Sequence, residues 1–184
     1  IAAEYAKSKK NEGLVVFAEE QTAGRGRAGS KWHSSRADSI LCSIVLTNSR
    51  ICAELLCLTC AVATAEAIGK PAKSEAKIKW PNDILLNGKK VAGILIEKFE
   101  IRNSKFEIAS IYIIGIGINC HQKKDSFPPE LQSIATSIDI EAQTICDRIL
   151  LAKRLLTCID SWLEVAEKNS THVTDRWREL STQL

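Results

Sequence analysis

"DILLNGKKVAGILIE", residues 83 to 97, is the stretch that decides how the middle of this chain folds. Asn87 and Gly88 stand between two apolar runs. The tightest hairpin turns need a positive φ at both central positions, which Asn and Gly adopt more readily than other residues. The stretch therefore predicts two antiparallel strands joined by a two-residue turn.

The segments on either side of this hairpin also read as strands. "AKIKW" (76–80) stops at Pro81, whose missing N–H ends a hydrogen-bond ladder. "FEIASIYIIGIGIN" (106–119) is expected as a long central strand, "LVVFAEE" (14–20) as a buried strand and "SILCSIVL" (39–46) as another. Strands in hairpin-connected groups predict an α+β fold with a mixed, mostly antiparallel sheet backed by helices.

Helices are expected where apolar residues recur with helical spacing or fill a long run. Gly13 and Gly69 are read as stop signals for the first two. The third opens with prolines, and the fourth carries one apolar face from Ile145 to Ala166. The expected helices cover residues 2–11, 51–68, 127–131, 145–166 and 173–180. We expect residues 1–184 to form one domain.

Composition is that of an ordinary globular protein. The 184 residues are 45% hydrophobic and 26% charged, and the net charge of +3 is too small to indicate a nucleic-acid binder. The seven cysteines show no zinc-like spacing, so no metal site is expected; free thiols in a reducing compartment predict a cytoplasmic protein. We expect no membrane span, because no apolar run approaches about 18 residues.

The loop "EEQTAGRGRAGSKW" (19–32) is rich in glycine and basic side chains. Gly24, Gly26 and Gly29 permit close backbone approach, and two arginines in a closed loop can clamp a phosphate. A solvated turn explains the same letters. The spacing "GRGRAG" fits a dinucleotide-binding loop poorly, since the residues after it do not open a helix.

Lys90 and Asp83 are the charged residues of the hairpin that attract a functional interpretation. By strict alternation Lys90 shares a face with Ala92 and Ile94, so a cation projects from an apolar face. It either reaches solvent from the strand end or neutralises a substrate anion, with Gly93 leaving room for the ligand. Asp83 lies at a corner where its carboxylate can enter a cleft.

Two glycines also interrupt the expected central strand "IIGIGINC" (113–120). Gly115 and Gly117 weaken an otherwise regular strand, so either a ligand or a helix is expected to pack against their backbone. Asn119, at the end of the strand, can both donate to and accept from a heteroatom-rich ring such as adenine.

Taken together, these motifs resemble the catalytic domain of biotin–protein ligases. "GRGRAGSKW" is similar to the GRGRxGxxW signature of that family, "KWPNDILLNGKKVAGILIE" to its KWPND block, and "IIGIGIN" to its G-x-G-I-N strand. "FPPELQSIATSI" is also similar, and the match follows the family order over about residues 1 to 180. The resemblance implies the fold shared by biotin ligases and class II aminoacyl-tRNA synthetases.

The resemblance implies that the chain joins biotin to ATP, giving biotinyl-5′-adenylate, and then transfers biotin to a lysine of a biotin carboxyl carrier protein. Magnesium would arrive with ATP. Lys90 would neutralise the biotin carboxylate, and Arg27 would retain the adenylate under a closing loop. Asp83 would orient or deprotonate the acceptor lysine. Arg25 is the fourth residue that the resemblance implies to be catalytic. The implied biotin and nucleotide contacts are Gln21, Gly24, Arg25, Gly26, Arg27, Trp32, Lys90, Gly93, Gly115, Gly117 and Asn119.

The chain departs from the family in several places. Family members carry a Ser/Thr-Thr-Asn biotin-gripping segment upstream and a small β-barrel downstream, and we expect both to be missing here. "HSSRADS" (33–39) stands where Pro and Gly-Gly-Asn or Gly-Ala-Asn are usual, with Ser35 and Ser39 at two of those positions. We expect no winged-helix DNA-binding domain before this part, so a biotin-repressor role is not supported. No nucleic-acid or membrane partner is expected. A homodimer through sheet extension stays open, because some family members form one.

Three rival functions remain. A lipoate or octanoate ligase would share the fold, but "KWPND" favours biotin. A nucleic-acid module would need aromatics among its basic residues, and only 5% of residues are aromatic. An inert binding domain, folded but without catalysis, is the third.

Overall fold

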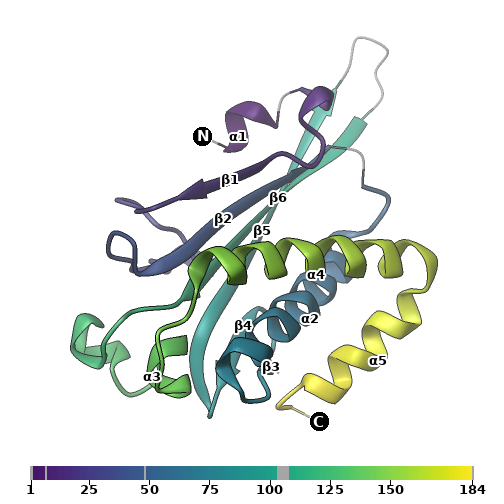
Figure 1. Ribbon diagram of the computed structural model, residues 1–184. Coiled ribbons are helices and arrows are strands. Elements are labelled where there is room, and N and C mark those ends of the chain that lie inside the picture. The colour runs from purple at the N-terminus through teal and green to yellow at the C-terminus, as the bar shows by residue number, and fades with distance from the viewer. Residues whose placement is uncertain (1, 7, 48, 103–107, 184) are drawn as a thin grey trace.

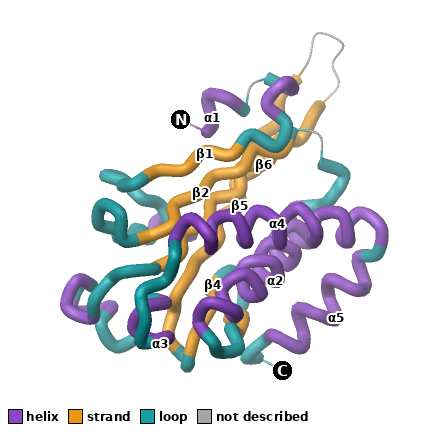
Figure 2. The backbone as a smooth tube through the Cα atoms, viewed as in Figure 1, coloured by secondary structure: helices purple, strands orange, loops and turns teal. Residues whose placement is uncertain are grey.

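The computed structural model describes residues 2–6, 8–47, 49–102 and 108–183. Within them, a six-stranded antiparallel sheet in the order β1-β2-β6-β5-β4-β3 carries three long helices on one face (Figures 1 and 2). The α+β expectation is therefore confirmed. The strands are β1 (Val15–Ala18), β2 (Ser39–Leu46), β3 (Lys77–Lys79), β4 (Asp83–Leu86), β5 (Lys89–Arg102) and β6 (Ile108–Asn119). The helices are α1 (Ala2–Tyr5), α2 (Ala53–Ala72), α3 (Ile138–Ala142), α4 (Arg148–Lys168) and α5 (Ser170–Leu180).

The hairpin of β4 and β5 forms as its turn residues predict. Asn87 and Gly88 have φ of 48° and 78°, the left-handed values that the two-residue turn demands. β5 then pairs with β6 from Ala92↔Ile118 to Arg102↔Ile108, which makes these two strands the longest ladder of the sheet. The expected strand at 106–119 is confirmed from residue 108; residues 106 and 107 lie outside the described part.

α2 is packed almost all round against the sheet, α4 and α5. It continues past the expected stop at Gly69 to Ala72, and Lys73 takes the left-handed cap with φ 49°. Pro71 lies in the last turn, where it cannot donate to the carbonyl of Ala67. Arg154 Nε of α4 donates to that carbonyl instead, at 3.2 Å, so the helix tolerates the proline.

α2 also corrects the expectation about membrane-length segments. It is long and apolar enough to span a membrane by length and composition, although 61% of its most apolar window is buried in the protein. Buried packing of this kind is typical of a core helix. Among the other helices in the described ranges, none meets the same test.

The first helix and the first strand are both shorter than expected. The single helix expected over 2–11 is two pieces, α1 and a 3-10 turn at Lys9–Asn11. The Asn11 side chain donates to the Tyr5 carbonyl at 2.7 Å, a local bond that competes with helical pairing. β1 covers only Val15–Ala18 at the edge of the sheet, and Phe17 is 47% exposed, so it is not a buried strand.

α4 forms close to where expected, and its expected apolar face is confirmed from Ala152 to Ala166 but not at its first two residues. Its N-cap is Asp147, whose carboxylate accepts from the Leu150 N–H at 2.9 Å. Ile145 therefore precedes the helix and is 83% exposed, and Ile149 is 71% exposed. The stripe that packs on α2 is Leu151, Leu155, Ile159, Trp162 and Ala166. The other expected helices are α5, which starts at Ser170, and a single 3-10 turn at Pro129–Leu131.

Candidate active site

The sheet face away from α2 and α4 is open around the glycines of β5 and β6, which form its floor. Even-numbered residues of β2 and β6 pack against the helices, so the odd-numbered ones lie on the opposite face. Part of that face is covered, since Val45, Ile111 and Ile113 are buried against Ala2, Ala6 and Leu14. Gly117 pairs directly with Gly93 on β5, and Gly115 pairs with Leu95. Because no side chain rises from these glycines, another group can lie close against the backbone there. Of the two readings left open for the β6 glycines, the structure excludes helix packing.

A β-bulge decides where Lys90 points. Leu85 pairs with Lys90 and Ile84 pairs with Ala92, so Val91 is an extra residue on β5. Val91 and Ala92 both pack in the core, although consecutive strand residues normally face opposite sides. Lys90 consequently shares the open face with Gly93. The expectation that it shares a face with Ala92 and Ile94 is wrong, because strict alternation does not anticipate the bulge.

Lys90 and Asp83 meet over the glycine floor. Lys90 Nζ lies 2.6 Å from Asp83 Oδ1, with the two side chains 36% and 26% exposed. The same Nζ lies 5.7 Å from the ring centre of Trp32, a cation–π contact. The backbone of Lys90 is also held, since its N–H donates to the Ile134 carbonyl and its carbonyl accepts from Thr136 N, both at 2.8 Å.

Trp32 is the side chain that fills the space above the glycines. A Cβ added at Gly117 would lie 2.5 Å from Trp32 Cε2, and one at Gly93 would lie 3.1 Å from its Cζ3. The indole is thus in direct contact with the sheet backbone. Its Nε1 is buried and has no hydrogen-bond partner among the described residues, which leaves one donor for a ligand.

The basic loop is a built turn rather than an unstructured one. Gly26 N donates to Ser30 O at 2.8 Å and Trp32 N donates to Gly24 O at 3.0 Å, so the two ends of the loop run antiparallel. Between them, Ala28 and Gly29 have φ of 51° and 78°. This turn presents the arginines outward: the Arg25 side chain is 71% exposed and pairs with Glu97 at 3.0 Å.

Loop and sheet together enclose a cavity of about 690 Å³. Ten of the predicted site residues line it: Gln21, Arg25, Gly26, Arg27, Trp32, Asp83, Lys90, Gly93, Gly115 and Gly117. Gly24 lines an adjoining hollow between the loop and β5 instead. The structure therefore brings residues from four separate segments to one place.

Asn119 is the exception among the predicted contacts. It is 4% exposed and is not among the residues that line the cavity. Its Nδ2 donates to the Thr136 carbonyl at 2.9 Å, and its Oδ1 accepts from Gln122 at 3.3 Å. Gln122 also donates to Ser39 Oγ at 2.5 Å. In this structure the Asn119 amide joins the end of β6 to β2 and the following loop, so it holds the site from below rather than facing a ring.

Sequence reasoning missed several polar residues that line the cavity, among them Glu97 and Asn82. Glu97 lies on the open face of β5 and pairs with Arg25. Asn82 Nδ2 donates to the Ile94 carbonyl at 2.8 Å, while Ile94 N donates to the Asn82 carbonyl at 3.0 Å. Alternation from Gly93 would have placed Glu97 on the correct face, whereas nothing in the sequence signals the Asn82 contacts.

The cysteines at and beside the cavity are not activated thiolates. Burial raises the pKa of Cys42, one of the lining residues, to about 12. Burial also raises the pKa of Cys57, and the Arg27 charge opposes that rise. A neutral thiol is a poor nucleophile, so the chemistry of this cavity rests on its cations, carboxylates and backbone. An anion entering here would meet Lys90 from below and the arginine turn from above.

The fold and this cavity define a class of protein. The profile of the biotin/lipoate A/B protein ligase family matches residues 2–119, more than half of the chain, so the chain belongs to that family. Its sheet and helices match the catalytic domain of biotin protein ligases. The biotin protein ligase from Aquifex aeolicus, solved in complex with biotin and ATP, superposes with a TM-score of 0.81 at 27% identity, over 99% of this chain and 74% of that one.

Curated relatives point to the biotin branch of the family. The bifunctional ligase/repressor BirA of Bacillus spizizenii is 40% identical over 161 residues, which cover 86% of this chain and 48% of the relative. The biotin–[acetyl-CoA-carboxylase] ligase of Mycobacterium tuberculosis is 30% identical over 151 residues, covering 79% and 52%. The chain thus spans about half the length of the curated relatives it matches.

Proposed function

We propose that the chain is an ATP-dependent biotin–protein ligase. The observation that carries the proposal is Lys90, a fixed cation over a glycine floor beneath an arginine-bearing turn, in a fold solved elsewhere with biotin and ATP. A carboxylate placed beside Lys90 would attack the α-phosphorus of ATP. Biotinyl-5′-adenylate forms and pyrophosphate leaves.

In this proposal Lys90, Arg25 and Arg27 act electrostatically, because each holds a positive charge where negative charge gathers or develops. Lys90 neutralises the biotin carboxylate as it approaches the phosphate, and Arg25 and Arg27 hold the negative charge of the adenylate from the turn. The turn also keeps water away from the mixed anhydride, which water would hydrolyse. The Arg25–Glu97 ion pair would open when the phosphate binds, because one guanidinium cannot hold both anions in its best geometry.

Transfer needs a lysine amine, and Asp83 is placed to receive it. Its carboxylate now holds Lys90 at 2.6 Å. Once Lys90 turns to the substrate, Asp83 can orient the acceptor amine or take its proton as nitrogen bonds to the acyl carbon and AMP leaves. The acceptor would be a lysine of a biotin carboxyl carrier protein. Magnesium would come with ATP and neutralise its phosphates.

Lipoate or octanoate transfer is the second candidate, since the family name covers both chemistries. The biotin-ligase relatives and the "KWPND" segment favour biotin. We also propose that the protein works in the cytoplasm, which accords with seven free cysteines.

Isothermal titration with biotin and then ATP tests the proposal. We expect heat with biotin, a second heat with Mg-ATP, and release of one pyrophosphate per adenylate formed. Lipoate is the matched control ligand. Heat with lipoate and none with biotin would overturn the assignment, and binding of both without pyrophosphate release would favour an inert binding domain.

A further inference from the structure

Outside the cavity, three potential metal ligands from separate segments converge beyond the end of β6. They are His121, which follows β6, Asp139 in α3, and Cys146 in the turn before α4. One ligand atom from each residue lies within 4.8 Å of the other two. Sequence spacing does not reveal this group, because its members are 18 and 7 residues apart.

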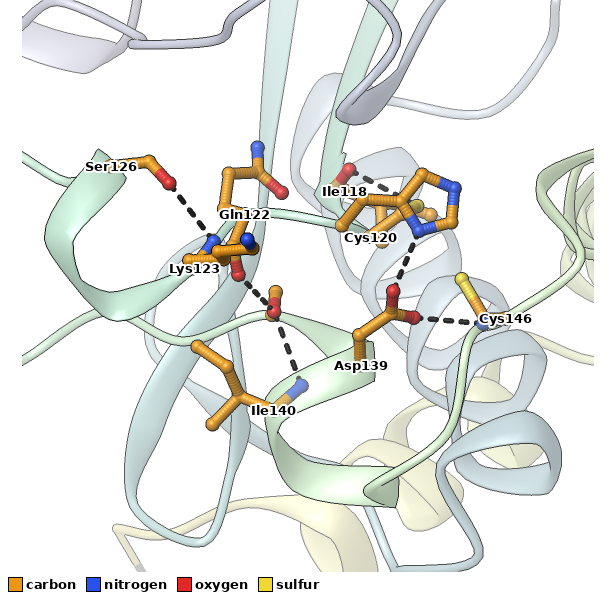
Figure 3. A network of polar contacts seen from close by, with 10 residues as sticks. Ile118, Cys120, Gln122, Lys123, Ser126, Asp139, Ile140 and Cys146 are labelled. Atoms are coloured by element: carbon orange, nitrogen blue, oxygen red, sulfur yellow. Dashed lines mark hydrogen bonds and ion pairs between the residues drawn. The ribbon is translucent and has the colours of Figure 1, made fainter.

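The group is held in place by its neighbours. His121 Nδ1 lies 2.8 Å from Asp139 Oδ2, and Asp139 Oδ1 accepts from Cys146 N at 2.8 Å (Figure 3). Asp139 N in turn donates to the Cys120 carbonyl at 3.0 Å. Ser137 caps the same short helix and donates to the Gln122 carbonyl at 2.7 Å. Hydrogen bonds of this kind orient the ligands of metal sites.

The donor set selects the kind of ion. Imidazole, thiolate and carboxylate together suit Zn²⁺, whereas Mg²⁺ and Ca²⁺ prefer oxygen alone. These three residues supply three ligands of a tetrahedral site, and a water from solvent takes the fourth position. The His121 and Asp139 side chains are 27% and 20% exposed, so an ion can reach the group from solvent.

We propose that His121, Asp139 and Cys146 bind a zinc-class divalent cation. The Cys146 thiol releases its proton to solvent as the metal–sulfur bond forms. The His121–Asp139 hydrogen bond opens at the same time: the ring gives up its Nδ1 proton to solvent and takes one on Nε2, so that Nδ1 and Asp139 Oδ2 both face the ion. The ion joins the end of β6 to α3 and α4. It also stabilises the segment that leads into β2, because Cys120 N and His121 N both donate to the Asp38 carbonyl, at 3.0 and 2.9 Å.

The experiment measures metal directly, so it can fail while the ligase proposal stands. The reduced chain is stripped with a chelator, given one equivalent of Zn²⁺ or Co²⁺, desalted, and analysed by elemental mass spectrometry and by the thiolate-to-cobalt absorption band. We expect about one ion per chain. At 100-fold Zn²⁺ excess over Kd the melting temperature should rise by about 5–10 °C.

Variants assign the ligands. Cys146→Ser and Asp139→Asn should each weaken metal binding at least about tenfold and abolish or shift the cobalt band. Asp139→Asn keeps an acceptor for Cys146 N, so it tests the charge even if the serine variant folds poorly. Cys158→Ser, at a half-buried thiol elsewhere on α4, should bind metal like the parent.

Three results would overturn the inference. The first is a reduced parent that retains no ion. The second is equal retention by the parent and both ligand variants. The third is a Cys120–Cys146 disulfide in peptide maps after mild oxidation, together with no metal retention by the reduced chain, which would make the two cysteines a redox pair.

Discussion

Replacement of Gly117 by alanine should disable the cavity without disturbing the fold. The added Cβ would lie 2.5 and 2.6 Å from Trp32 Cε2 and Cζ2, and ordinary contact begins near 3.4 Å, so the indole must retreat by roughly 0.9 Å. Overpacking of this kind costs about 1–3 kcal/mol. Because each 1.4 kcal/mol is tenfold, biotin binding should weaken about 5- to 150-fold. Gly117 has no positive φ, so alanine brings no backbone strain.

Gly115 supplies the matched control. It lies on the same strand and lines the same cavity, yet a Cβ there would meet only Leu95, at 3.5 Å from its O and 3.8 Å from its Cβ. Gly115→Ala should therefore leave pyrophosphate release within about twofold of the parent, since 3.5 Å is ordinary contact. The assay compares biotin-dependent pyrophosphate release with melting temperature for each variant. Gly115→Ala should melt with the parent, and Gly117→Ala at most about 12 °C lower, since 1 kcal/mol shifts the melting temperature by about 2–4 °C in a domain of this size.

A double-mutant cycle tests whether Trp32 carries the effect. In a Trp32→Ala background the clash is gone, so Gly117→Ala should change biotin binding by less than about twofold. The reasoning is refuted if the two glycine variants behave alike, or if the Gly117 effect persists undiminished without the indole.

Three further outcomes are expected. Lys90→Ala should keep the melting temperature but reduce adenylate formation at least about 100-fold, the loss expected for a group that stabilises developing charge. The neighbouring variant Lys89→Ala should form adenylate at the rate of the parent. Equal rates for Lys90→Ala and the parent in the pyrophosphate assay would refute this role. Arg27→Gly should release the adenylate, seen as biotin on bystander lysines; unchanged labelling would argue against retention by that side chain. Burial raises the pKa of Cys42 to about 12 from 9.0, so the folded chain keeps a proton that the unfolded chain loses. Stability from this thiol should fall by about 1.4 kcal/mol per unit as pH rises from 9 toward 12, and urea unfolding should show a flatter alkaline slope for Cys42→Ala.

Turns and strands could be predicted from the sequence because the residues that determine them are neighbours in the chain. The Asn87-Gly88 turn and the strand at 39–46 depend on neighbouring residues only, and both formed as expected, whereas the strand expected at 14–20 is shorter and is not buried. The ends of the helices were harder to predict from the sequence. α2 outlasts Gly69 because Arg154, far along the chain, supplies the donor that Pro71 lacks. A distant partner of that kind leaves no trace in the local pattern.

The candidate site was predictable in membership but not in arrangement. Ten of the residues that the sequence motifs singled out line one cavity in the structure. The pairing of Lys90 with Asp83, and the role of Asn119 as a support, depend on register and on loop contacts that no single segment encodes. Glu97 was missed because its partner Arg25 is distant in the chain and joins it only in the folded protein.

The bulge at Val91 has a consequence for anyone who moves this motif into another protein. The extra residue reverses the alternation of side chains along β5. Residues before the bulge therefore face the side opposite to the one that alternation from the residues after it predicts. A graft of "KKVAG" onto a straight strand would keep every residue and still aim the lysine into the interior. Deleting Val91 should instead leave Lys90 on the open face, since plain alternation from Gly93 through Ala92 would then reach Lys90 on the same side as Gly93. The position of the Lys90 cation therefore depends on the number of residues in the strand as much as on their identity.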